Sequence, residues 1–349
     1  MILVKNLLAQ RPVEASAPCR VDSGGTWDIK ALALPFEAIQ PTTVNIALTL
    51  RTSASLHPYN DGKVKINSIG FAQPEIFSMD RLPFDSPYGL FFAAISFFGF
   101  HGLEVRINSQ SPVRSALGGS STAIVALIKA LSKLSISLGN KGYTKKEILH
   151  LAYHLEDGIS GGNCGIQDQT AAVYGGVHQW EWQYGNRTAP IQKSSLLDGD
   201  GRKELSKRLL VAYSGKTHTS AKTNNQWVKD FLSGKTRPGW IKANEIVRQL
   251  GEAIKTWDWN RAASLLREEM SIRKEITPEA LTPFTKKLIE EAEDAGCGAR
   301  FAGAGAGGSL WAVGKLKKID QLKARWGATL AYVKGAKILD CKVDPAGVR

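Results

Sequence analysis

Residues 15–110 carry polar and apolar side chains in partial alternation, which is typical of β-strands. Residues 42–56 and 63–69 are rich in β-branched side chains, and residues 103–108 alternate between the two kinds. A period of two places successive side chains on opposite faces of a strand. We therefore expect a strand-rich region here, with one strand ending just before residue 111.

Beyond this region, apolar side chains recur every three or four positions, as in a helix that is buried on one side. The positions that carry this period are Leu117, Ile124, Leu127, Ile128, Leu131 and Leu134. Thr144 and Glu147 have the spacing of a capping box, which indicates the start of a second helix. The pattern predicts one helix over residues 120–135 and a second helix from the capping box at Thr144 to about residue 156.

The rest of the chain mixes both patterns without strict alternation. We expect strands at 177–182, 208–213 and 329–333, and helices that begin near 167 and cover 239–256, 258–273, 282–295 and 318–326. Gly296 stands where a helix C-terminal glycine belongs. This mixture favours an α+β fold over a doubly wound parallel sheet.

A polar stretch without a period covers residues 187–202, in the middle of the chain. A chain of 349 residues is long enough for two domains. We therefore place the domain boundary in this stretch and predict an N-terminal domain of residues 1–200 and a C-terminal domain of residues 201–349.

Three loops of small residues lie between the predicted elements: the first loop (17–28), the phosphate loop (111–123) and the late glycine loop (302–309). Gly118 and Gly119 in the phosphate loop permit a tight turn and a close approach of a ligand to the backbone. Ser120 or Ser121 is expected to cap the following helix. The unpaired amides of a helix N-terminus bind phosphate, although a capped helix after a glycine turn explains the same residues.

Composition narrows the function classes. The net charge is +13, but the basic residues are spread out and no aromatic side chains are interleaved with them, so we expect no nucleic-acid partner. No apolar run is long enough to span a bilayer, so we expect no membrane association. The four cysteines have no C-x-x-C spacing, which argues against a disulfide framework or a zinc site and favours a cytoplasmic protein.

Two acidic residues, Glu156 and Asp168, are candidates for phosphoryl-transfer chemistry. Such an enzyme needs oxygen ligands for magnesium and often a carboxylate that accepts the proton of the acceptor. A purely structural interpretation is also open. Glu156 is then a solvated residue near a helix end, and Asp168 is a charge stabilised by a helix dipole. Sequence spacing alone does not choose between these interpretations.

Residues 214–217 look like the end of a Walker A loop, but Leu210 occupies the position of the required glycine. A turn after a strand is the better interpretation. Lys216, His218 and Lys222 remain candidates for contact with an anionic group.

Taken together, the three loops and the segment around Asp168 resemble the GHMP kinase superfamily, which includes galactokinase, homoserine kinase, mevalonate kinase and phosphomevalonate kinase. The four segments occur in the family's order, and Asp168 precedes Gly175 and Gly176 as in the mevalonate kinase pattern. The resemblance implies a two-domain α+β fold with the active site in the cleft between the domains. It also implies ATP and Mg²⁺ as cofactors and a small-molecule acceptor.

The resemblance assigns a role to each motif residue. Asp168 is the implied base with Arg20 beside it, and Ser120 and Glu156 are the implied Mg²⁺ ligands. The implied ATP-binding residues are Pro112, Leu117, Gly118, Gly119, Ser120, Ser121 and Thr122. A cation at Arg20 is expected to keep Asp168 ionised.

Within the superfamily, residues 24–28 and 165–169 look most like sugar kinases, in particular heptose 7-phosphate kinases and fucose kinase-like enzymes. The residues implied in acceptor binding are Gly25, Thr26, Asp28, Gly165, Gln167, Lys216 and Gly305. The basic charge suits an acceptor that already carries a phosphate. We therefore expect a sugar or sugar-phosphate kinase that is a monomer or homodimer.

The chain departs from the family pattern at several positions. Ala116 and Ala306 replace glycines, Gly119 replaces a serine, Ser309 replaces a cysteine, and Trp27 stands within a Gly-Gly-Thr-Trp-Asp motif. Two alternatives to a sugar kinase stay open. One is a kinase for a mevalonate- or homoserine-like acceptor, and the other is a sensor that binds sugar and ATP without catalysis.

Overall fold

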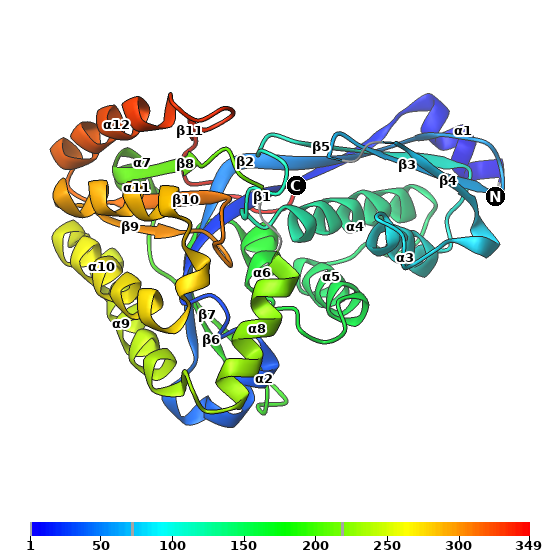
Figure 1. The fold of residues 1–349 in the computed structure, drawn as a ribbon. Helices are drawn as coiled ribbons and strands as arrows, with labels where there is room; N and C mark the ends of the chain where they lie inside the picture. Colours follow the sequence, from blue (N-terminus) through cyan, green and yellow to red (C-terminus); the bar gives the residue numbers. More distant parts are fainter. Residues whose placement is uncertain (1, 71–72, 218–219) are drawn as a thin grey trace.

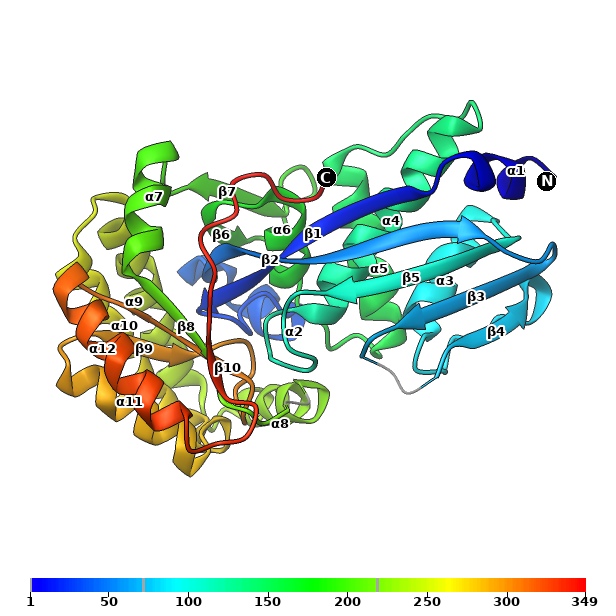
Figure 2. The same ribbon diagram turned by 90° about the horizontal axis from the view of Figure 1, so that it is seen from above.

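The structure, a computed structural model, describes residues 2–70, 73–217 and 220–349, with the side chains of 2–3 and 220–222 outside this description. Two β-sheets, each with its own helices, lie beside one another (Figures 1 and 2). Helices and strands are mixed without strict alternation along the chain. The predicted α+β class is confirmed.

The first sheet has seven strands, in the order β4-β3-β5-β2-β6-β7 with β1 paired to β2. Its strands are β1 (Val13–Ser23), β2 (Thr42–Pro58), β3 (Lys63–Ser68), β4 (Glu75–Ser78), β5 (Leu103–Ser109), β6 (Val177–Trp182) and β7 (Ile191–Ser195). All pairs are antiparallel except β3 with β5. The strand predicted just before residue 111 is β5.

Helices cover one face of this sheet (Figure 1). The helical elements of this half are α1 (Ile2–Gln10), α2 (Lys30–Ala33), η1 (Leu34–Ile39), η2 (Met79–Arg81), α3 (Gly89–Phe98), α4 (Gly119–Ser137), α5 (Lys145–Ile159) and α6 (Gln167–Tyr174). The capping box predicted at Thr144 and Glu147 is present at the start of α5. Helix α4 packs on β1 and β2 through the predicted apolar side chains.

Helix α4 is, among the described residues, the one helix long and apolar enough to cross a membrane. In the fold, 72% of its most apolar window is buried. Its high hydropathy is explained by this position between the first sheet and α5, since a helix packed on several sides is apolar around most of its circumference.

The second sheet has four strands in the order β11-β8-β10-β9, all antiparallel. Its strands are β8 (Leu209–Tyr213), β9 (Gly298–Phe301), β10 (Ser309–Val313) and β11 (Lys337–Leu339). The helical elements of this half are α7 (Gly199–Arg208), α8 (Ser220–Leu232), α9 (Arg237–Lys255), α10 (Trp259–Ile276), η3 (Pro278–Ala280), α11 (Pro283–Asp294) and α12 (Leu316–Leu330). Gly296 follows α11 with a φ of 75°, as the sequence predicts.

Two sequence predictions about elements are wrong. The expected strand over residues 329–333 is the end of α12 and a turn, because Trp326 and Leu330 lie four residues apart on the buried face of that helix. Residues 187–202 are not irregular throughout, since they contain β7 and the start of α7. Strand β7 is mostly exposed at the edge of the sheet, so it has no apolar alternation to detect.

The chain passes from the first sheet to the second between Ser195 and Leu209, and its end returns to the first sheet. The Asp344 amide donates to the Ala47 carbonyl at 2.8 Å. The last residue, Arg349, donates its amide to the carbonyl of Ser16 at 2.9 Å. The C-terminal tail therefore connects the two halves a second time, and the domain division at residue 200 stays a prediction.

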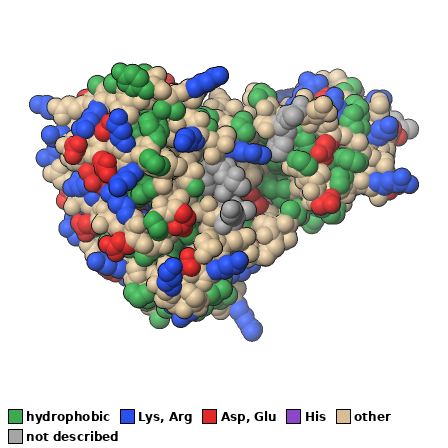
Figure 3. Space-filling model, in the orientation of Figure 1, with side chains coloured by type: hydrophobic (Ala, Val, Ile, Leu, Met, Phe, Trp, Pro, Cys, Tyr) green, Lys and Arg blue, Asp and Glu red, His purple; other side chains and the backbone are tan. Residues whose placement is uncertain are grey.

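Lys and Arg side chains are scattered over the face shown in Figure 3 and are interspersed with acidic ones. The net charge of +13 is thus not gathered into one basic stripe on this face. A distributed charge of one sign raises the local concentration of anionic small molecules without defining a binding surface.

Candidate active site

The phosphate loop turns into α4 at Gly118, which has a φ of 76° and stands at the N-cap without a side-chain capping bond. The predicted capping role of Ser120 or Ser121 is wrong, because both hydroxyls donate to Glu156 instead. The first amides of a helix have no partner inside the helix, and the helix dipole adds partial positive charge there. This N-terminus is suited to phosphate groups.

Glu156, on α5, faces the start of α4. Its carboxylate accepts hydrogen bonds from Ser120 Oγ at 2.6 Å, Ser121 Oγ at 2.7 Å and Gln169 Nε2 at 2.7 Å. Burial raises the pKa of Glu156 above its usual value, and these hydrogen bonds oppose the rise. A hydroxyl and a carboxylate in contact are hard oxygen donors of the kind that Mg²⁺ prefers, so Ser120 and Glu156 fit this ion.

Arg20 and Asp168 form an ion pair at the centre of the site. Arg20 Nε and Nη2 both lie 2.7 Å from Asp168 Oδ1, and Arg20 Nη1 donates to the Ala116 carbonyl at 2.7 Å. The register of β1 against β2 shifts between Pro18 and Arg20. Such a bulge redirects a side chain, and here it accompanies an Arg20 that reaches α6.

Asp168 keeps one carboxylate oxygen available. Its Oδ1 is held by Arg20, whereas Oδ2 accepts no hydrogen bond from the described residues, and 23% of the side chain is exposed. Burial raises the pKa of Asp168 above its ordinary value, and the charge of Arg20 opposes this rise. The group is therefore a stronger base than an aspartate in water while its guanidinium partner favours the ionised form.

Asp28 is almost fully buried beside this pair. Its Oδ1 accepts the Thr26 amide and its Oδ2 accepts the Gln167 amide, both at 2.9 Å. Desolvation raises the pKa of Asp28 to about 6, although both backbone hydrogen bonds favour the ionised form. Gly165 must be glycine at this point, since a Cβ there would lie 1.9 Å from Asp28 Oδ2.

Two cavities meet at Asp168. The larger cavity, of about 380 Å³, lies between the phosphate loop and strands β3 and β5. The smaller cavity, of about 110 Å³, is lined by the first loop, residues 164–168 and the start of α4. The residues that line both are Arg20, Ser120, Asp168, Gly303 and Ala304.

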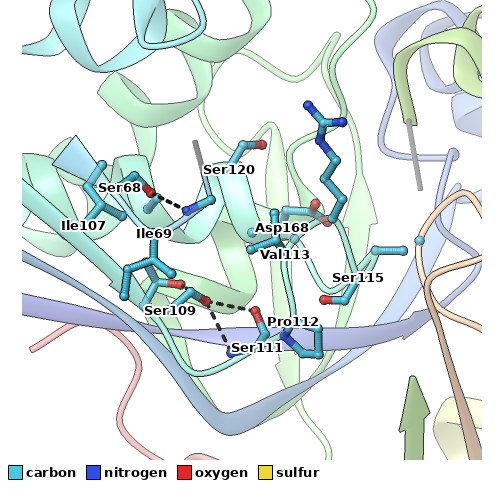
Figure 4. A pocket seen from close by; sticks show the side chains of 18 of the residues that line it. Ser68, Ile69, Ile107, Ser109, Ser111, Pro112, Val113, Ser115, Ser120 and Asp168 are labelled. Atoms are coloured by element: carbon cyan, nitrogen blue, oxygen red, sulfur yellow. Dashed lines mark hydrogen bonds between the residues drawn. The ribbon is translucent and has the colours of Figure 1, made fainter. Parts of the chain in front are cut away.

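Figure 4 shows the larger cavity with Ile69 and Ile107 on one side and Asp168 and Val113 on the other. The side of Ile69 and Ile107 is apolar apart from Ser68, and the hydroxyls of Ser109 and Ser111 hydrogen-bond to each other near it. An apolar slot that leads to a phosphate-binding helix N-terminus has the form of a nucleotide site.

The smaller cavity is polar. Most of the predicted acceptor residues line it, and these are Gly25, Thr26, Asp28, Gly165 and Gln167. Two others, Gly305 and Lys216, do not. Gly305 packs against Ala280, and Lys216 is exposed, with its carbonyl accepting the Gly308 amide.

The predicted ATP-binding residues divide between the two cavities and the core. Pro112, Gly118, Gly119 and Ser120 line the larger cavity, and Ser121 lines the smaller one. Leu117 and Thr122 are buried beneath the loop. His218 and the side chain of Lys222 lie outside the described residues.

Sequence reasoning missed Asn224, which lines the smaller cavity from α8, and Gln169, which holds Glu156. Gln169 directly follows Asp168, so its place in the site could have been predicted from the sequence. Helix α8 was not predicted, although its buried side chains Trp227, Val228 and Phe231 recur at helical spacing. The sequence analysis also missed Asp22. Its Oδ1 accepts the Gly303 amide at 2.8 Å and so fixes the late glycine loop.

The sequence matches two family models. Residues 88–176 match the GHMP kinases N terminal domain, and residues 251–331 match the GHMP kinases C terminal model. The chain belongs to the GHMP kinase family. It is thus a small-molecule kinase that transfers a phosphoryl group to a hydroxyl acceptor, and the first model includes the phosphate loop, Glu156 and Asp168.

Relatives of this GHMP kinase act on different acceptors. It is 28% identical over 324 residues to the mevalonate kinase of Pyrococcus horikoshii, an alignment that covers 87% of this chain and 89% of that protein. It is 29% identical over 223 residues to the D-glycero-alpha-D-manno-heptose 7-phosphate kinase of Campylobacter jejuni, covering 62% of each.

Solved structures confirm the fold. Lactococcus lactis galactokinase in complex with galactose superposes with a TM-score of 0.76 at 17% identity, covering 100% of this chain and 98% of that one. Methanococcus jannaschii mevalonate kinase superposes with a TM-score of 0.71 at 18% identity, covering 95% and 98%. Both sugar kinases and mevalonate kinases are therefore among the relatives of this chain. The acceptor has to be inferred from the residues of the site.

Proposed function

We propose that this GHMP kinase phosphorylates a hydroxyl of a sugar, with MgATP in the larger cavity and the sugar in the smaller one. The observation that carries the proposal is the position of Asp28, a buried carboxylate in the smaller cavity beside Asp168. A carboxylate accepts hydrogen bonds from two hydroxyls of one acceptor. The amides Gln167 and Asn224 and the hydroxyl of Thr26 complete a lining suited to a polyol.

Charge favours this acceptor over mevalonate. The smaller cavity is lined by Asp28, Glu156 and Asp168, and its cation among the described residues, Arg20, is paired with Asp168. An acceptor that carries its own carboxylate meets the like charge of Asp28, which forms no ion pair with a described residue, and a pair of like charges in a partly dry cavity costs free energy. A neutral sugar meets hydrogen-bond acceptors that it can satisfy.

The proposed mechanism relies on positioning and charge. Asp168 Oδ2 accepts the proton of the attacking hydroxyl, and Arg20 stabilises the carboxylate before the transfer and the negative charge near the alkoxide during it. The amides at the start of α4 bind the ATP phosphates. Ser120 and Glu156 are the residues that would hold Mg²⁺, which neutralises phosphate charge when bound.

The test is an acceptor screen that measures ADP release from MgATP with galactose, fucose, heptose 7-phosphate, mevalonate and homoserine. We expect turnover with a sugar. We expect Asp168→Asn to lower kcat by about 100-fold or more, since that is the usual contribution of a general base, with the KM for ATP little changed. Asp320→Asn, at an exposed position on α12, is the matched control and should leave both constants unchanged.

A mevalonate-type acceptor is the second candidate, because mevalonate kinases from several archaea match nearly the whole chain. Preferred turnover of mevalonate in the same screen contradicts the sugar proposal and supports this one. An unchanged rate in Asp168→Asn contradicts the base assignment whichever acceptor is used.

A further inference from the structure

Trp27 lies between two residues of the smaller cavity, Thr26 and Asp28, but does not line that cavity itself. Its side chain is fully buried. Thr26 has a φ of 91°, which is strained for a β-branched residue. Such a conformation persists where the surrounding packing enforces it, and the neighbouring Trp27 supplies that packing.

The rings around Trp27 come from Phe36 of its own half and from two residues of the other half. Trp27 meets Phe231 of α8 at 5.7 Å and Trp240 of α9 at 6.4 Å between ring centroids, both edge to face. Its Nε1 donates to the Trp240 carbonyl at 3.3 Å. Phe231 and Asn224 are seven residues apart on α8, so they lie on the same side of that helix. The packing of Trp27 therefore fixes Asn224 as well as Asp28.

A buried arginine completes this core. The guanidinium carbon of Arg273 lies 4.6 Å from the ring centroid of Trp227 and 4.3 Å from that of Trp240. Arg273 Nε donates to Thr277, whereas Nη1 and Nη2 have no hydrogen-bond partner among the described residues. An arginine in this state is costly to bury, and the ring faces compensate the charge together with Glu269, 4.0 Å away. We call Trp27, Trp227, Phe231, Trp240 and Arg273 the tryptophan–arginine cluster.

From this cluster, charges of alternating sign lead to the base. Glu269 lies 4.0 Å from the cluster's guanidinium and 2.8 Å from Arg300. Arg300 lies 2.9 Å from Asp22, and Asp22 lies 3.5 Å from Arg20, the partner of Asp168. One continuous buried network thus contacts the acceptor side of the site at Trp27 and the base at its other end.

We propose that the tryptophan–arginine cluster positions the acceptor-binding residues relative to Asp168 and so determines which acceptors are phosphorylated. The cluster does this without touching acceptor or nucleotide, because none of its members lines either cavity. Trp27 and Arg273 are its positioning residues: the first holds the strained first loop, and the second holds α8 and α9 through Trp227 and Trp240. The inference rests on the proposed function for its kinetic consequence only.

The test compares Arg273→Met, which keeps an apolar stem and removes the cation, with the wild-type chain. Hydrogen–deuterium exchange of residues 24–29 and 223–232 should accelerate about tenfold, the effect of losing a desolvated cation–π contact. The affinity for a non-hydrolysable MgATP analogue should stay within twofold. With the sugar found in the screen, KM for the acceptor should rise about tenfold while kcat changes less than threefold.

Trp27→Phe is the second variant, in case the first fails to fold, and should give the same pattern. Its matched control is Trp326→Phe, since Trp326 is also fully buried and also donates its Nε1 to a carbonyl, that of Leu288, but lies on α12 away from both cavities. This control should lower stability without changing the acceptor KM.

Exchange that accelerates equally over the whole chain, or an acceptor KM that shifts no more than in Trp326→Phe, overturns the positioning role. The exchange measurement needs no acceptor. If the screen yields no sugar turnover, the proposed function fails while the exchange data still decide the inference.

Discussion

Individual residues in this site act through their surroundings. Asp168 and Asp28 are both aspartates, yet Arg20 holds one oxygen of the first while backbone amides hold both oxygens of the second. Ala116 and Ala306, where the resemblance implies glycine, adopt φ values of 63° and 57°. The backbone therefore keeps the path of the glycine loops at the cost of a left-handed conformation that alanine disfavours.

The pKa of Asp28, raised to about 6, predicts an acid limit for acceptor binding. Above this value the carboxylate is ionised and accepts hydroxyl hydrogen bonds; below it a proton occupies one oxygen. We expect kcat/KM for the sugar to fall about tenfold per pH unit below pH 6, as for a single essential ionisation. A pH series of initial rates at saturating MgATP measures this.

The control for this pH series is the affinity for the MgATP analogue, which should change little over the same range. A profile that stays flat down to pH 5 contradicts the ionised role of Asp28. The same shift has the opposite sign for stability: a carboxyl whose folded-state pKa is raised favours the folded state as pH falls from about 6 toward the ordinary aspartate value of 3.8.

At the scale of elements, the start of α4 serves two purposes at once. Its amides face the larger cavity, and its N-cap glycine packs on the base: a Cβ at Gly118 would lie 3.2 Å from Asp168 Oδ2. Gly119, one residue later, lines the larger cavity, and a Cβ added there would meet no described atom within 4 Å. Adjacent glycines thus face the base and the nucleotide site, respectively.

Gly118→Ala should therefore lower kcat at least tenfold and cost roughly 1–2 kcal/mol of unfolding free energy, since alanine is strained at positive φ. Gly119→Ala is the matched variant, which should leave stability unchanged and raise the KM for ATP. Denaturant unfolding together with steady-state kinetics measures both. Equal effects of the two substitutions on stability and kcat contradict this division.

At the scale of the whole molecule, the halves are joined at several places besides the chain between β7 and β8, among them α9 against β2 and two connections that contain ion pairs. One is the buried network from the tryptophan–arginine cluster through Arg300 to Asp22. The other is the C-terminal tail, where Asp344 pairs with Arg51 of β2 and also accepts the amides of Ala346 and Gly347.

Asp344→Ala should destabilise the protein by about 3–5 kcal/mol, because the partly buried Arg51 loses its charged partner and keeps only hydrogen bonds to Ser16 and the Gly347 carbonyl. Asp340→Ala is the matched control, an exposed aspartate four residues earlier that should change stability by less than about 0.5 kcal/mol. Calorimetric unfolding measures both variants. A loss no larger than that of the control contradicts a role of the tail in holding the halves together.

The sequence by itself determined the elements whose signals are local: the capping box of α5, the apolar period of α4, the turn at Gly296 and the α+β class. It did not reveal β7, because an exposed edge strand carries no apolar alternation. It did not reveal α8 either, although Trp227, Val228 and Phe231 bury one face of that helix.

Only the tertiary structure decided which residues meet. Arg20 and Asp168 are 148 residues apart in sequence and Ser120 and Glu156 are 36 apart, and no spacing rule spans such separations. The glycine loops could be predicted from the sequence because the backbone conformation that favours glycine is local. The cluster around Trp27 could not be predicted, since a buried ring and a buried guanidinium are recognised only by the residues that pack against them.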